Sequence, residues 1–212
     1  GAGLVLVAAV VVGLLTLGAE LHLEYLTRFG EFAARPKIAV AYQNIPAFRN
    51  RLLAWEGHSP TPAYAHLVEP LSVAGQVLLL VPPVVLLLLR PWRRLSEGDR
   101  LAELSLLLLA TVLAAQGSGL HTMVYALPGL VAAVVWLRRR AGDGAPHVVW
   151  WAMAWTVAWC LLALEFQYRA PGLEHGLRVV LISSKLAGGL ILWALLLRMC
   201  VPTRAGVTES CG

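Results

Sequence analysis

Charged residues are scarce in this sequence of 212 residues, at 14% against 58% apolar residues. The mean hydropathy is +0.71, and Leu, Val and Ala are gathered in runs rather than spread evenly. A soluble domain of this length does not need so large an apolar fraction. A helix that crosses a bilayer needs about 20 mainly apolar residues around an internally hydrogen-bonded backbone. The scarcity of charge therefore indicates an integral membrane protein.

Cysteine and the common catalytic motifs are also lacking. Cys160, Cys200 and Cys211 lie too far apart to form a metal-ligand set or a disulfide framework, so we expect them to pack. The histidines show no spacing typical of a metal or haem site. There is no P-loop, G-x-S-x-G or H-E-x-x-H motif, which leaves nucleotide-driven transport and the standard membrane hydrolases without support. We therefore expect neither a metal nor another cofactor.

The apolar runs predict an all-α fold, a polytopic transmembrane helical bundle with about six spans. We expect one transmembrane domain over residues 1–212, in which a long polar segment follows the first span. The predicted spans are residues 2–19, 70–89, 101–117, 120–137, 148–165 and 178–198. The connector at residues 116–119 is so short that it predicts a tight hairpin between the third and fourth spans.

The basic residues predict the orientation of the bundle. The net charge is +5, but the cations stand beside apolar runs, so we expect a lipid bilayer as partner and no nucleic acid. Connectors rich in Lys and Arg stay in the cytoplasm, and nine of the 17 basic residues share one predicted side. These are Arg90, Arg93, Arg94, Arg100, Arg138, Arg139, Arg140, Arg198 and Arg204. We therefore expect a multi-pass protein of the plasma membrane. Its outer face then carries the segment 20–69, the tip at 116–121 and the connector 166–177.

The outer segment 20–69 contains two apolar stripes with helical spacing. They are Leu21, Tyr25, Phe29 and Phe32, and then Ile45, Phe48, Leu52 and Trp55. Both stripes predict amphipathic helices that lie along the membrane surface. Three prolines, Pro60, Pro62 and Pro70, are expected to break the chain before the second span.

The basic side chains of this segment allow two interpretations of their role. They could neutralise a phosphate head group at the lipid surface, or they could only solvate the outer face of amphipathic helices. They are Arg28, Arg35, Lys37, Arg49 and Arg51. His121, at the hairpin tip, could donate to a phosphate or have a structural role. Lys185, inside the sixth span, is a functional candidate that could also snorkel to the surface.

Two stretches resemble the polyprenol-phosphate-sugar-dependent membrane glycosyltransferases of glycosyltransferase family 87, which are of GT-C type. In EYLTRFGEFAARPKIAVAYQNIPAFRNRLL, Gln43 and the R-L-L of residues 51–53 match a family motif. In QGSGLHTMVYALPGL, Ser118, His121 and Pro128 match the family's hairpin, usually written S-P-x-S-W-x-H-H and followed by L-P. Tyr42, Asn44, Gln116, Gly119 and Thr122 differ from the family pattern.

The resemblance implies transfer of a sugar, most simply mannose, from a polyprenyl-phosphate donor to a glycolipid or cell-envelope glycan. It implies a catalytic role for His121 and contacts of Arg35, Lys37, Gln43 and Arg51 with the donor phosphate or sugar. The chain opens on Gly1 without an initiator Met, so we expect a C-terminal portion of a larger enzyme whose catalytic carboxylate lies upstream. The alternatives are a non-enzymatic polytopic membrane protein, such as a transporter segment or structural subunit, and a different enzyme or flippase of lipid-linked glycans.

Overall fold

The structure is a computed structural model, described for residues 20, 23–24, 27–28, 43–53, 64–90, 95–115, 120–145, 147–163 and 178–201. The side chains of residues 65, 120 and 121 lie outside this description. Packing divides the chain into two compact units, residues 1–36 and residues 37–212. In the first unit, the exposed side chains of Glu24 and Arg28 form an ion pair of 2.6 Å. The predicted span 2–19 lies outside the described residues.

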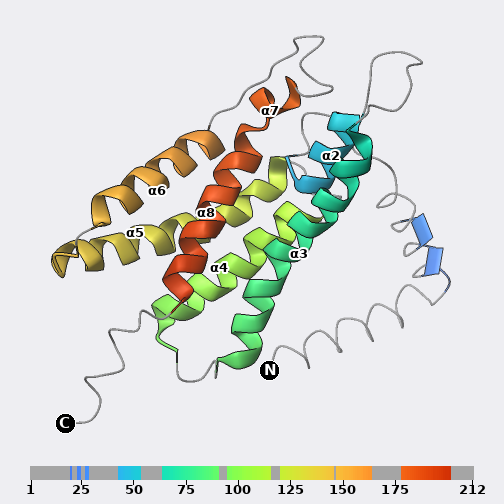
Figure 1. The fold of residues 1–212 in the computed structure, drawn as a ribbon. Coiled ribbons are helices and arrows are strands. Elements are labelled where there is room, and N and C mark those ends of the chain that lie inside the picture. Colours follow the sequence, from blue (N-terminus) through green and yellow to red (C-terminus); the bar gives the residue numbers. More distant parts are fainter. Residues whose placement is uncertain are drawn as a thin grey trace. The chain divides into compact units, whose positions relative to one another are not determined.

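Every regular element among the described residues of the second unit is a helix, which confirms the all-α prediction (Figure 1). The helices are α2 (Ile45–Leu53), α3 (Ala65–Leu89), α4 (Glu97–Ala114), the 3-10 helix η2 (Leu120–Ala126), α5 (Leu127–Gly142), α6 (Val148–Ala163), α7 (Val179–Ile182) and α8 (Ser184–Cys200).

Two helical segments are long and apolar enough to cross a membrane, namely His66–Leu89 and Thr122–Gly142. In His66–Leu89, only 17% of the most apolar stretch of 18 residues is buried, and Leu88 is 77% exposed. A core helix of a soluble protein would be mostly covered, so this exposure favours contact with lipid. α4 has four charged residues in its first two turns, while α6 and α8 have 16 and 17 residues. The number of six spans therefore stays a prediction.

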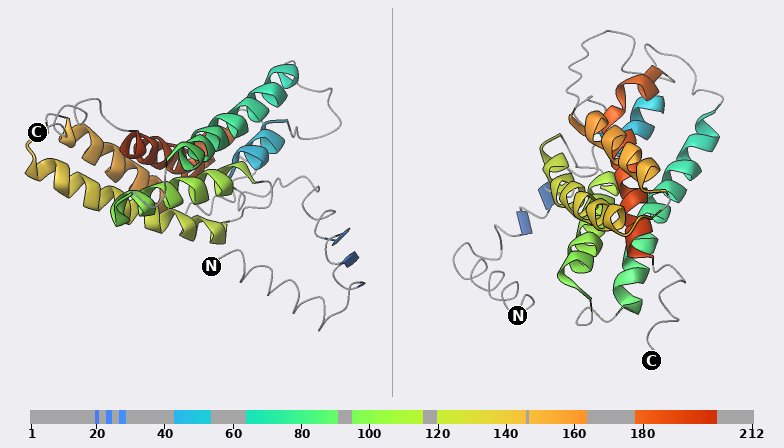
Figure 2. Two further views of the ribbon diagram at one scale, coloured as in Figure 1. Left: turned by 90° about the horizontal axis from the view of Figure 1, so that it is seen from below. Right: turned by 90° about the vertical axis from the view of Figure 1, so that its left-hand side faces the viewer.

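α8 is the central helix of the second unit, because it packs against α3, α4, α5 and α6. In the right-hand view of Figure 2 it lies between α3 and the pair α5 and α6. Small residues allow this approach: a Cβ on Gly188 would stand 2.9 Å from the carbonyl oxygen of Ala158 in α6. Close packing of helix backbones at glycine is typical of membrane bundles.

The proline prediction for α3 is wrong at one position. The helix begins at Ala65 and continues through Pro70, because this proline removes only one N–H, in the second turn of the helix. Pro83, deeper in the helix, cannot donate to the carbonyl oxygen of Leu79. That oxygen instead accepts a hydrogen bond of 3.2 Å from the indole Nε1 of Trp193 in α8. A neighbouring helix thus satisfies the group that proline leaves without a donor.

The helices of the second unit run between two ends. Figure 1 shows α2 and α7 beside the upper end of α8, which we call the α2 end. The last turn of α3 and the first turns of α4 lie at the lower, opposite end, where Arg90 and the buried Glu103 form an ion pair of 2.8 Å.

Candidate functional site

The predicted sixth span is not continuous. α7 ends at Ile182 and α8 begins at Ser184, with Ser183 between them at φ −92° and ψ 37°. The sequence expectation of one helix over 178–198 is therefore corrected to a short turn of helix, a break and a long helix. The hydroxyl of Ser183 donates to the carbonyl oxygen of Val179 at 2.8 Å, so its side chain satisfies a backbone group next to the break.

α2 and the residues directly before it bring two of the predicted site residues to this break. The amide Nε2 of Gln43 donates to the carbonyl oxygen of Ile182 at 3.2 Å. The Nη2 of Arg51 donates to the hydroxyl of Ser183 at 3.4 Å. Gln43 and Arg51 were predicted from one short segment, and the structure places both against residues more than 130 positions further along the chain.

α2 is fixed at both ends, which holds Gln43 and Arg51 in place. The side chain of Asn44 accepts a hydrogen bond from the backbone N–H of Ala47 at 2.8 Å, the arrangement of a helix N-cap. At the other end, the hydroxyl of Tyr64 donates to the carbonyl oxygen of Leu52 at 3.0 Å. That carbonyl lies in the last turn of α2, where no later helical N–H reaches it.

The burial of Arg51 excludes one of the two interpretations of this cation, that of a solvated face. Arg51 is 0% exposed and Gln43 is 3% exposed, so α2 is not a surface helix with Arg51 on a solvated face. That expectation is wrong for Arg51. Asn44, next to Gln43, is also 0% exposed. A guanidinium remains charged when it is buried, and a buried charge is screened by salt much less than an exposed one. The α2 end thus contains a fixed interior positive charge.

Lys185 stands in the first turn of α8, two residues after Ser183. Its ammonium donates to the carbonyl oxygen of Leu162 at 2.9 Å, in the last turn of α6, where a cation is favoured by the helix dipole. Lys185 therefore joins α6 to α8 at the α2 end. We call Gln43, Arg51, Ser183 and Lys185 the polar junction.

An apolar groove of about 220 Å³ lies next to the polar junction. The two share Leu162, which lines the groove and whose carbonyl oxygen accepts the hydrogen bond from Lys185. η2 supplies Met123, Val124 and Ala126, and α5 supplies Leu127 and Leu130. We call this the η2 groove. Its remaining walls are Trp159 and Ala163 of α6.

The other predicted site residues are placed only in part. His121 belongs to η2, two residues before Met123 of the groove, and its side chain lies outside the described residues, as do Arg35 and Lys37. Within the described part of the chain no group of three or more His, Cys, Asp or Glu could hold a metal ion. Ser183 and Asn44 were not expected as site residues, although the Ser-Ser pair before Lys185 in an apolar run signalled a polar position.

Comparison of the chain with models of protein families, with curated proteins and with solved structures finds no match. The resemblance to family 87 glycosyltransferases therefore rests on the two short motifs.

Proposed function

We propose that this chain is part of a membrane glycosyltransferase of GT-C type, which transfers a sugar, mannose in the simplest case, from a polyprenyl-phosphate donor to a glycolipid or envelope glycan. One observation carries the proposal. The two segments that resemble this enzyme family contribute to neighbouring features at the α2 end, the polar junction and the η2 groove. The polar junction is cationic and suits the phosphate of a lipid phosphate, and the η2 groove is apolar and suits its hydrocarbon chain.

In the proposed topology the protein crosses the plasma membrane about six times with the α2 end outside. Basic side chains at the opposite end support this orientation, since cytoplasmic connectors carry the excess of Arg and Lys. The described ones are Arg90, Arg100, Arg138, Arg139, Arg140 and Arg198. The segment 20–69 then begins and ends on the outer face.

The proposed reaction breaks the bond between the anomeric carbon of the sugar and the donor phosphate, whose oxygen keeps the electron pair. The acceptor hydroxyl oxygen forms the new bond to that carbon, and its proton passes to a carboxylate of the intact enzyme. The family resemblance assigns the direct contacts with the departing phosphate to Lys37 and His121, and Arg35 is a further candidate from the sequence. Arg51 is buried, so it would stabilise the phosphate through its field and would position the break at Ser183.

The test is transfer of labelled mannose from polyprenyl-phosphate mannose in membranes that contain the intact protein, followed in the glycolipid and glycan fractions. We expect His121→Ala to abolish transfer while membrane insertion is unchanged. His66→Ala is the matched control, because His66 is an exposed histidine in the first turn of α3 at the same end. Normal transfer by His121→Ala would reject the catalytic role, and no transfer by the unmodified protein would reject the proposed activity.

A non-enzymatic protein such as a transporter segment is the second candidate, and the broken helix at Ser183 favours it. Transporters bind substrates where discontinuous helices expose polar groups, near the bilayer midplane. Here the break lies one short turn from the start of α7, next to Gln43 and Arg51. Movement of a labelled lipid phosphate across vesicle membranes without sugar transfer would favour this second function.

A further inference from the structure

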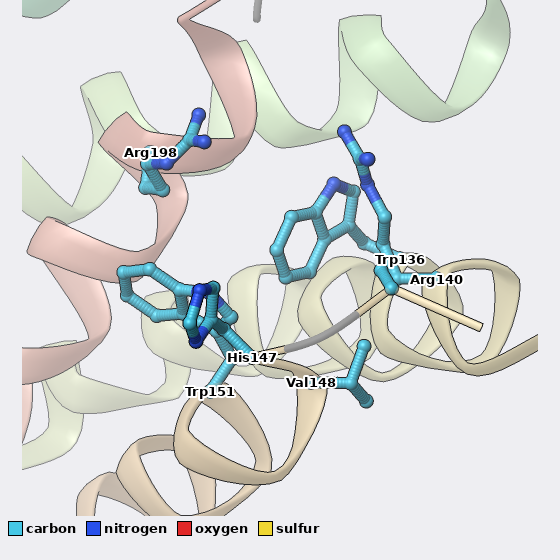
Figure 3. A pocket seen from close by; sticks show the side chains of 7 residues that line it. Trp136, Arg140, His147, Val148, Trp151 and Arg198 are labelled. Atoms are coloured by element: carbon cyan, nitrogen blue, oxygen red, sulfur yellow. The ribbon is translucent and has the colours of Figure 1, made fainter. Parts of the chain in front are cut away.

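A basic cavity lies at the opposite end of the second unit, where α5, α6 and α8 meet. Its volume is about 160 Å³. It is lined by Trp136, Arg140, Ala145, His147, Val148, Trp151 and Arg198 (Figure 3). Neither the polar junction nor the η2 groove shares a residue with it.

The charge of the cavity is of one sign. Arg140 and Arg198 contribute guanidinium groups, and no Asp or Glu is among the lining residues. Within the described part of the chain neither arginine forms an ion pair. The nearest acid along the chain, Asp143 at the end of α5, is exposed and does not line the cavity. Two guanidinium groups without a carboxylate suit a phosphate, which they bind with charge-assisted hydrogen bonds.

The aromatic rings hold part of this charge in place. The guanidinium of Arg140 lies over the ring of Trp136, 5.6 Å from its centroid, and the rings of Trp136 and Trp151 pack edge to face with centroids 6.4 Å apart. Stacking on an indole reduces the freedom that an arginine loses when it binds a ligand. The cavity also lies at the N-terminus of α6, where the helix dipole favours an anion.

An apolar groove along α8 shares the lining residue Arg198 with the cavity. It has a volume of about 360 Å³ and is lined by Trp193, Ala194, Leu197, Arg198 and Val201. Arg198 therefore lines both the basic cavity and the groove, which we call the α8 groove. A free phosphate would use only the cavity, whereas a phospholipid would use both.

We propose that the basic cavity and the α8 groove together bind one anionic phospholipid, with its phosphate between Arg140 and Arg198 and one acyl chain along Trp193, Ala194 and Leu197. Basic pockets between membrane helices are suited to acidic head groups. The tryptophans place the cavity at the depth of the head groups, since indoles favour the membrane interface. The site does not depend on the proposed transferase activity, so either proposal can fail alone.

Native mass spectrometry of the full chain in detergent tests the site with dioleoyl phosphatidylglycerol, dioleoyl phosphatidylcholine and inorganic phosphate as probes. We expect one phosphatidylglycerol to be retained in preference to phosphatidylcholine, which has the same chains and no net charge. The double variant Arg140→Gln/Arg198→Gln should weaken its binding by about tenfold or more, the loss expected for two charge-assisted contacts. The control Arg138→Gln/Arg139→Gln removes equal charge from exposed neighbours and should bind as the unmodified protein does.

The lipid is distinguished from a free anion by Ala194→Trp, which fills the exposed α8 groove and leaves the cavity open. We expect this variant to lose phosphatidylglycerol, and it also remains informative if the double arginine variant does not fold. Equal retention of the two lipids, or an equal loss in the control variant, would overturn the proposal. Unchanged lipid binding by Ala194→Trp, with inorganic phosphate competing fully, would reduce the site to one for free anions and overturn the phospholipid assignment.

Discussion

Replacing Gly188 by alanine tests the close packing of α6 and α8 directly. The new Cβ would stand 2.9 Å from both the carbonyl oxygen of Ala158 and the Cβ of Leu161. Ordinary contact begins near 3.4 Å, so the two helices must separate by about 0.5 Å. Because one obstacle is backbone, rotation of a side chain cannot relieve the clash. Overpacking of this kind costs about 1–3 kcal/mol.

The propensity of alanine for helices opposes this cost, so a matched control is needed. Alanine is more favourable than glycine inside a helix by up to about 1 kcal/mol. Gly75 in α3 offers the control, because a Cβ there would meet only the flexible Cδ1 of Ile45, at 3.3 Å. The propensity gain is common to both variants, and the difference between them isolates the clash.

The assay is thermal unfolding in detergent, followed by circular dichroism. We expect Gly188→Ala to be less stable than Gly75→Ala by about 1–3 kcal/mol, with about 2–4 °C in Tm for each kcal/mol in a chain of this size. Equal Tm values for the two variants would refute the packing of α6 against α8 at Gly188.

Two further variants test single hydrogen bonds between helices. Trp193→Phe removes the donor to Leu79 and should lower the free energy of unfolding by about 1 kcal/mol. A second change, Pro83→Ala, should restore the loss by returning the helical donor, and failure to do so would contradict the role of the indole. Lys185→Met removes the hydrogen bond to Leu162 and should lower the free energy of unfolding by about 1 kcal/mol in the same assay. Lys185→Arg keeps the positive charge and should retain most of the stability. Equal losses in both variants would show that the ammonium does not hold α6.

Apolar periodicity predicted the helices well, because burial or lipid contact sets where each one lies. The run at 148–165 corresponds to α6, and the stripe that begins at Ile45 corresponds to α2. Helix boundaries near prolines and serines were less predictable. At Ser183 a side-chain hydroxyl competes for the backbone, and this local choice leaves no trace in the apolar pattern.

The candidate site was predictable only as a set of residue types. Gln43 and Arg51 could be selected from the sequence as candidates, but their partners Ile182 and Ser183 belong to a distant segment. The burial of Arg51 could not be predicted either, since three polar residues in a row, Arg49, Asn50 and Arg51, have the pattern of a solvated face. The packing of α2 against α3, α4 and α7 decides which of the three is fully buried.

The proposed topology is tested most directly by measuring on which side of the membrane each end of the bundle lies. Single cysteines at Glu69 in α3 and Asp143 after α5, both exposed, would be introduced after Cys160, Cys200 and Cys211 are replaced. Intact cells would then be treated with a membrane-impermeant thiol reagent. We predict that Glu69→Cys is labelled from outside and that Asp143→Cys is labelled only after permeabilisation. Labelling of both from the same side would contradict a bundle that crosses the membrane with its α2 end outside.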